Sequence, residues 1–242
     1  MILQSALTQR IITISLTQIW PIIYTSILAY KVIKRAKNQL TYTLSFIFAI
    51  NSIVYFLPIF SVLFINVSGM IAYAFYIIPF FLFIFNQGLI VIFTWLLTKL
   101  GEKFSIIKII TLIIIDGLIS SYVFWIGILF GGIRYDSETG WIPTFSLEFA
   151  YLSWIIATIV FLLPEMLLSI KIIITYEGKI MRKRIRLFLI GMFLEFMFIY
   201  YLVLYNTWVE NQVFRMFNPL IALPLGIFSA YFIYKGFGKE LT

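Results

Sequence analysis

"MIAYAFYIIPFFLFIFNQGLIVIFTWLL", residues Met70–Leu97, contains no charged side chain. An α-helix rises about 1.5 Å per residue, so about 20 apolar residues are enough to cross a hydrocarbon core of roughly 30 Å. The stretch does not alternate apolar and polar residues with a period of two, as a strand of a membrane barrel would. We therefore expect a membrane-spanning helix, in which every backbone polar group is satisfied internally.

Similar apolar runs recur through the whole chain of 242 residues, of which 62% are hydrophobic and 12% charged. The mean hydropathy is +1.04, far above that of a soluble domain. The composition predicts an all-α integral membrane protein, a single seven-transmembrane helix bundle covering residues 1–242. The expected spans lie near residues 11–31, 41–65, 70–97, 105–130, 146–171, 187–209 and 215–235.

The positively charged residues predict the orientation of the bundle. All of the 18 lysines and arginines except Arg10, Arg134 and Arg215 fall on the connections after spans one, three and five or at the C-terminal end. Because cytoplasmic loops carry the excess of Lys and Arg, we expect the N-terminus outside and the C-terminus in the cytoplasm. The net charge of +8 then follows from topology, and no nucleic-acid partner is expected.

The absence of cysteine and histidine restricts the available chemistry. It removes thiol nucleophiles, disulfides, imidazole bases and the usual zinc, copper or haem ligand sets. We expect no catalytic residues, no metal and no cofactor, and place the protein in the cell membrane as a multi-pass protein with the lipid bilayer as its surroundings.

Three acids fall inside predicted spans: Asp116, Glu165 and Glu195. A charge at the bilayer centre costs at least about 2.5 kcal/mol, so such residues are expected to face the bundle interior. Lys108 lies two helical turns from Asp116 and is a candidate counter-ion. We predict an intramembrane polar cluster of these four residues, serving either an ion, proton or signal-coupling role or a structural one.

Four amides also fall within the predicted spans: Gln18, Asn51, Asn86 and Gln87. Amide side chains join transmembrane helices through hydrogen bonds of roughly 1 kcal/mol each. They are expected to link helices, with a polar substrate path as the alternative.

A polar stretch between two predicted spans is "GGIRYDSETGWIPTF", residues Gly131–Phe145. It is longer than the usual connection of about 2 to 8 residues in a helix bundle, and long loops are often functional. We expect an ordered lid over the outer mouth that is anchored by Trp141. Arg134, with Asp136 and Glu138, would contact a polar ligand, or the three would pair with one another.

Two short motifs suggest a family. The outer Gly140-Trp141 pair and the inner basic stretch leading into "RIRLFLIG", Arg184 to Gly191, resemble the seven-transmembrane sensor region of archaeal and bacterial histidine kinases. In that family the membrane region is thought to pass a signal to a cytoplasmic catalytic domain. The chain ends at Thr242, shortly after the last span, so the resemblance implies a receptor-like module that acts through a cytoplasmic or membrane signalling partner, without kinase activity of its own.

Two other functions stay open. A carrier of the SWEET sugar-transporter kind also has seven spans, built as two triple-helix repeats joined by the fourth. Pro21 and Pro164 occupy matching places in spans one and five, whereas Pro58 has no counterpart in span six. A membrane enzyme would need acids gathered at one interface, and Asp136 and Glu138 have no third acid at ligand spacing.

Overall fold

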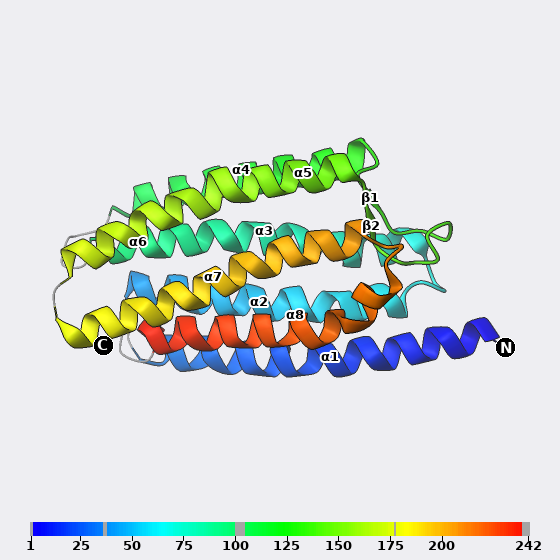
Figure 1. Ribbon diagram of the computed structural model, residues 1–242, viewed down its shortest axis with the longest axis horizontal. Coiled ribbons are helices and arrows are strands. Elements are labelled where there is room, and N and C mark those ends of the chain that lie inside the picture. The colour runs from blue at the N-terminus through cyan, green and yellow to red at the C-terminus, as the bar shows by residue number, and fades with distance from the viewer. Residues whose placement is uncertain (1, 36–37, 100–104, 177, 239–242) are drawn as a thin grey trace.

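The computed structural model describes residues 2–35, 38–99, 105–176 and 178–238, and for residues 2–13, 16, 218, 219 and 238 it describes the backbone alone. Long antiparallel helices form nearly all of this part of the chain (Figure 1). The elements are α1 (Ile2–Ile33), α2 (Gln39–Leu63), α3 (Gly69–Leu97), α4 (Ile106–Leu129), β1 (Ile133–Arg134), β2 (Thr144–Phe145), α5 (Leu147–Ile156), η1 (Ala157–Leu162), α6 (Leu163–Thr175), α7 (Lys179–Thr207), α8 (Gln212–Ile233) and η2 (Tyr234–Gly238).

Six helices in the described part of the chain are long and apolar enough to cross a membrane. They are Gln39–Leu63, Gly69–Leu97, Ile106–Leu129, Leu147–Thr175, Lys179–Thr207 and Leu220–Phe237. The first predicted span, 11–31, lies within α1, which packs beside α2 and α8. The described chain is therefore a helical bundle of membrane-spanning character.

The two ends of the bundle differ in charge. The N-terminus and the strands β1 and β2 lie at one end, which we call the hairpin end, and the C-terminus lies at the other (Figure 1). Basic residues gather at the second end, called the basic end, where α1, α3 and α6 finish and α4 and α7 begin. Those with a described position are Lys31, Lys34, Arg35, Lys99, Lys108, Lys171, Lys179, Arg182, Lys183, Arg184, Arg186 and Lys235, whereas Lys37, Lys103 and Lys239 lie outside the described residues.

The basic segment before the sixth predicted span is helical, which corrects the expected loop near 172–186. Helix α6 continues to Thr175 and α7 begins at Lys179, so only residues 176–178 join them. A prediction based on apolar runs places the end of a span at the first charged residues. Lys and Arg are nevertheless good helix formers, and their long side chains reach water from a helix that extends beyond the apolar zone.

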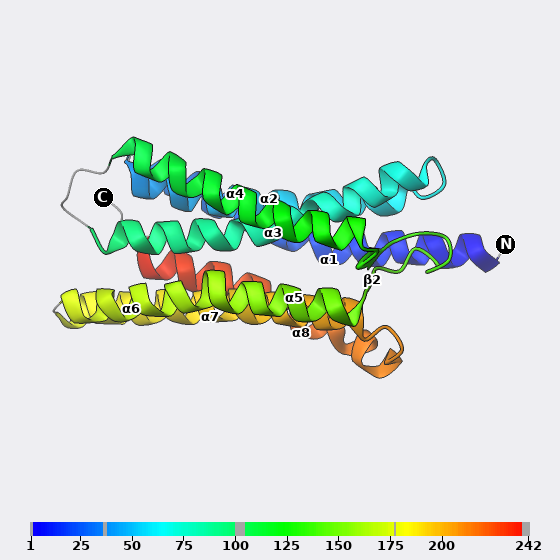
Figure 2. The same cartoon turned by 90° about the horizontal axis from the view of Figure 1, so that it is seen from above.

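Helices α5, η1 and α6 follow one another without a break and are called the α5–α6 rod. Helix α3 lies at the centre of the bundle, between α2, α4 and this rod (Figure 2). In its 18-residue apolar window 72% of the residues are buried, against 17% in the corresponding window of α4. Its first half contributes Ile77, Phe80 and Phe83 to one apolar cluster, and its second half contributes Leu89 and Phe93 to another. Like α7, α3 belongs to both clusters, so it connects the packing at the two ends of the bundle.

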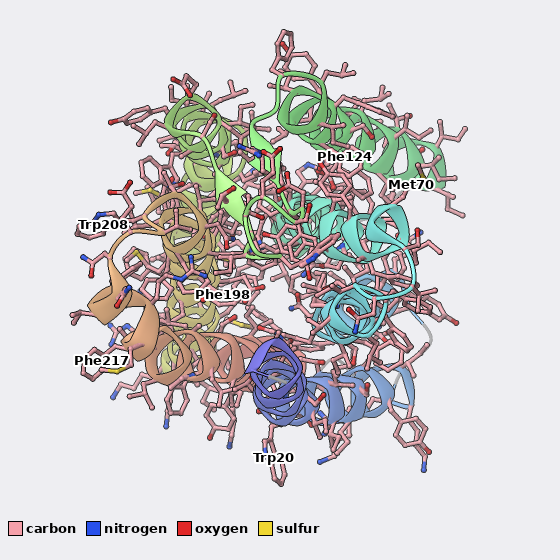
Figure 3. All side chains as sticks on the ribbon, turned by 90° about the vertical axis from the view of Figure 1, so that its right-hand side faces the viewer. Trp20, Met70, Phe124, Phe198, Trp208 and Phe217 are labelled. Atoms are coloured by element: carbon pink, nitrogen blue, oxygen red, sulfur yellow. The ribbon has the colours of Figure 1, made fainter. Side chains whose placement is uncertain are left out.

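Apolar side chains also cover the outside of the bundle. Figure 3 looks from the hairpin end, with Phe198 in the interior and Trp20 and Phe217 directed outward. Trp20 is 64% exposed, whereas Phe198 is 7% exposed. A soluble monomer rarely exposes so much apolar surface, so this arrangement fits a protein surrounded by lipid.

The α5–α6 rod contains a π-helical segment, η1, that the apolar pattern did not reveal. The N–H of Leu163 donates to the carbonyl of Thr158, five residues earlier. Pro164 follows, and because a proline ring lacks an N–H and collides with the carbonyl four residues before it, the wider turn relieves the helix at this point. The inward-facing residues then follow every fourth position: Phe149, Ser153, Ala157, Phe161, Glu165 and Ser169.

Candidate functional site: a buried polar network

A network of buried polar side chains joins four helices around Glu195 of α7. Asn51 of α2 donates through Nδ2 to Glu195 Oε1 at 3.4 Å. Asn86 of α3 donates through Nδ2 to Asn51 Oδ1 at 2.9 Å. The hydroxyl of Ser229 on α8 donates to Glu195 Oε2. The side chain of Gln87, whose Nε2 donates to the carbonyl of Phe83 at 3.4 Å, lies beside the carboxylate. These five residues, none more than 5% exposed, are called the Glu195 network.

Two oxygens of the Glu195 network have no hydrogen-bond donor. They are Asn86 Oδ1 and Gln87 Oε1, both fully buried. The partners shown for Glu195 are amides and a hydroxyl, all neutral. A buried acceptor without a donor costs about 1 to 3 kcal/mol, and a buried charge without a counter-ion costs more. The network is therefore rich in acceptors and carries no positive charge of its own.

Glu165, predicted to belong to the same cluster, occupies a different place. It lies on α6, 2% exposed, and Ser169 of the same helix donates to its Oε1 at 3.3 Å. Thr94 of α3, whose hydroxyl donates to the carbonyl of Ile90 at 3.0 Å, lies beside the carboxylate, and Oε2 has no hydrogen-bond partner. Thr94 is two helical turns from Asn86 along α3, so Glu165 lies nearer the basic end than the Glu195 network.

Asp116 forms a third buried site, between α4 and α3. It is 5% exposed, Ser120 lies 3.5 Å from its Oδ1, and its Oδ2 has no partner. A methyl group added at Gly88 of α3 would overlap its carboxylate, which shows how closely the two helices approach. Lys108 is exposed in the first turn of α4 and is not among the partners shown for Asp116. The three acids and Lys108 thus lie inside or beside one bundle without forming one cluster.

The predicted amides divide in the same way. Asn51, Asn86 and Gln87 join the Glu195 network, whereas Gln18 lies on α1, half-buried, with a buried Oε1 that has no partner. Ser229 was missed by sequence reasoning because a serine in a transmembrane helix usually bonds to its own backbone and carries no distinctive pattern.

The connection between α4 and α5 is an ordered hairpin, residues 130–146. Strands β1 and β2 pair Ile133 with Phe145 and Arg134 with Thr144. In the turn, the N–H of Thr139 donates to Asp136 Oδ1 at 2.9 Å, and the N–H of Trp141 donates to the Asp136 carbonyl at 2.8 Å. These local bonds satisfy the backbone of the turn and hold its shape.

Aromatic contacts attach the hairpin to α3. Tyr135 is 2% exposed and stacks on Tyr76 of α3 with ring centroids 4.9 Å apart. Trp141, the predicted anchor, is half-buried, meets the edge of Tyr135 at 5.5 Å and covers Gly69 at the start of α3. Sequence reasoning missed Tyr135, although the alternation of Ile133, Arg134 and Tyr135 in a strand would have placed it on the buried face.

Arg134, the predicted ligand contact, is paired within the hairpin. It binds Glu138 Oε2, and its Nε lies 3.4 Å from Asp136 Oδ2. The hydrogen bond that Arg134 donates to Glu138 and the charge of Asp136 raise the pKa of the exposed guanidinium further above its usual range. The three charged side chains therefore pair with one another, which is the second of the two roles considered for them.

The hairpin turn is expected to loosen in acid. The N–H of Thr139 and the neighbouring Arg134 keep the pKa of Asp136 below the usual aspartate range. Because the folded pKa lies below the unfolded value of about 3.9, the carboxylate stabilises the turn above that pH and loses the effect as pH falls through the folded pKa. A spin label at Ser137→Cys should gain mobility over that acid range. Asp136→Ala, which removes the side-chain acceptor of the Thr139 N–H, should be mobile throughout and show no acid step. A label equally ordered at all pH values would contradict this role for Asp136.

A small apolar cavity lies among α3, α4, η1 and α7, lined by Phe80, Val123, Ser153 and Ile199 among others. Its volume of about 10 Å³ is close to that of one water probe. The hydroxyl of Ser153 faces this apolar wall without a hydrogen-bond partner. In this conformation the cavity is too small for a sugar or another organic solute.

The comparisons with known proteins assign the chain to no family. Within the described residues, no group of three or more His, Cys, Asp or Glu side chains is placed to hold a metal ion. No family model matches the chain, and neither the curated proteins nor the solved structures contain a match to it.

Proposed function

We propose that this protein is a receptor-like membrane sensing module that acts through a signalling partner in the cytoplasm or the membrane. In this proposal α1 crosses the membrane as well, which makes seven spans with the six long apolar helices. The hairpin end faces outside and the basic end faces the cytoplasm. The asymmetric distribution of basic residues between the two ends supports this orientation.

The attachment of the hairpin to α3 is the observation that supports the sensing role most. Tyr135 and Trp141 pack on the first turns of α3, and the middle of the same helix carries Asn86 and Gln87 of the Glu195 network. A ligand that moves the hairpin would thus act on the most buried helix of the bundle, and through the network on α2, α7 and α8. Packed cores and polar networks with discrete arrangements transmit such changes better than flexible connections do.

The start of α7 is a suitable contact surface for a partner at the basic end. Lys179, Arg182, Lys183 and Arg186 are exposed and follow the spacing of one helix face. They would attract an acidic segment of a signalling protein or the anionic lipids around it. Helix α7 also carries Glu195, so contact at this surface and a change in the network involve the same rigid element.

A SWEET-like carrier is the second candidate, favoured by the peripheral position of α4. Of this helix only one stripe is buried, formed by Asp116, Ser120, Val123 and Gly127, as expected for a span that links two halves. A carrier also needs a polar passage at mid-depth. The centre of the described bundle instead holds the buried Glu195 network and an apolar cavity of about 10 Å³, which favours the receptor-like role.

Coupling between the two ends tests the proposal. The chain has no cysteine, so Thr175→Cys introduces a single exposed thiol at the end of α6. Tyr135→Ala removes the stacking on Tyr76 and should change the maleimide labelling rate at residue 175 several-fold, whereas Ser137→Ala, an exposed hairpin position, should not. Equal rates in Thr175→Cys alone and in its combinations with Tyr135→Ala and Ser137→Ala would contradict coupling.

A transport assay tests the carrier. Accumulation of labelled glucose by vesicles that contain the reconstituted protein would favour that role.

Reporter fusions test the orientation. Fusions after Lys37, Lys103 and Lys183 should all report a cytoplasmic location, and a fusion after Gly140 should report an external one, because Lys and Arg near span ends resist translocation. A fusion after Asn66 is a second external control. The inverse pattern at all positions would overturn the orientation, and a mixed pattern would overturn the seven-span topology.

A further inference from the structure

The Glu195 network has the composition of a cation site. It brings together five side chains from α2, α3, α7 and α8 and contains one ionisable carboxylate, two unpaired amide oxygens and a hydroxyl. Carboxylate, amide and hydroxyl oxygens are the ligands that hard cations prefer. The side chains themselves supply these oxygens, so no helix has to be interrupted to offer backbone carbonyls as ligands.

The charge of the network indicates which cation fits. Glu195 contributes a single negative charge, and the shown partners from the other three helices, Asn51, Gln87 and Ser229, are neutral. A lone carboxylate matches one positive charge, whereas a divalent ion would leave an excess charge in an apolar interior. No group of three acids is available among the described residues to compensate it.

From this arrangement we infer that the Glu195 network binds a small monovalent metal cation of the size of Na⁺, with the Glu195 carboxylate as its principal ligand. Asn86 Oδ1 and Gln87 Oε1, which lack donors, are the oxygens free to join the carboxylate. The cation would neutralise Glu195 and tie α3 to α7. This inference is independent of the receptor-like role, because a bound Na⁺ would serve a carrier equally well.

The test measures thermal unfolding of the purified protein in detergent, with NaCl replaced by choline chloride at equal ionic strength. Na⁺ should raise the unfolding temperature progressively once its concentration exceeds Kd, because a ligand that binds only the folded state stabilises it by RT ln(1 + [L]/Kd). Glu195→Gln should lose this response. Glu165→Gln removes another buried acid outside the network and should keep it.

A second variant guards against a misfolded Glu195→Gln protein. Ser229→Ala retains the carboxylate but removes one oxygen, so its Kd for Na⁺, above which the unfolding temperature begins to rise, should increase several-fold. Binding of radioactive Na⁺ to the wild-type protein and to Ser229→Ala gives the same comparison without unfolding. Absence of a Na⁺-specific response in the wild-type protein, or an undiminished response in Glu195→Gln, would overturn the inference.

A proton is the competing occupant, and the same experiment separates it. Among the described residues the ionisable group that acts on Glu195 is Tyr55 of α2, which does not titrate in the acid range. If acid stabilises the protein equally in Na⁺ and in choline, and Glu195→Gln abolishes that effect, the site holds a proton and the metal-cation assignment is wrong.

Discussion

Gly191→Ala is expected to destabilise the protein by about 2 to 3 kcal/mol, because the added methyl group would meet the backbone of a neighbouring helix. A Cβ at Gly191 of α7 would lie 2.6 Å from the nitrogen of Ile233 and 2.8 Å from the carbonyl oxygen of Ser229, both on α8. Backbone atoms cannot rotate away as the end of a side chain can. The two helices must therefore separate, and the contact between Ser229 and Glu195 lies directly beside this crossing.

Gly117→Ala on α4 is the matched control. It is the same substitution within a membrane-spanning helix, yet the nearest atom to its Cβ is Phe85 Cε2 at 3.9 Å, an ordinary contact. Alanine is a better helix former than glycine by about 1 kcal/mol, so this variant should be neutral or more stable. The free energy of unfolding from reversible denaturation in mixed detergent micelles gives both values. Equal effects of the two substitutions would show that α7 and α8 do not pack closely at Gly191.

Asn51→Leu should cost about 2 to 4 kcal/mol, since it leaves two buried groups without partners and each costs about 1 to 3 kcal/mol. The groups are Asn86 Nδ2 and Glu195 Oε1, which Asn51 now joins. Leucine has a similar volume, so the loss reports hydrogen bonding rather than a cavity. Asn66→Leu, an exposed asparagine between α2 and α3, is the control and should change the unfolding free energy little.

A double-mutant cycle shows whether Asn51 and Asn86 act together. Once Asn86→Leu has removed the donor to Asn51, the further change Asn51→Leu should cost less than it does in the wild-type protein. Hydrogen bonds between transmembrane helices average about 0.6 kcal/mol in such cycles, so a larger coupling would mark this pair as unusually important. Strict additivity of the two changes would mean that the two amides do not interact in the membrane.

Local properties of the chain predicted much of the fold. Hydropathy and charge act over consecutive residues, so the apolar run from Met70 to Leu97 predicted α3, and the basic residues predicted which end of the bundle would carry positive charge. The polarity of residues 131–145 likewise predicted a distinct connection between α4 and α5. The cost of a carboxylate in lipid was sufficient to place Asp116, Glu165 and Glu195 in the interior.

Only the tertiary structure decided which of these residues meet. Neighbours across helices depend on the rotation and depth of each helix, which are set by packing of the whole bundle rather than by any local pattern. Asn51 and Glu195 are partners because α2 and α7 both face α3, while Glu165 reaches Thr94 because the π-helical turn before Pro164 keeps every fourth residue inward. The contact of Tyr135 with Tyr76 joins residues from separate parts of the chain, and therefore required the folded bundle.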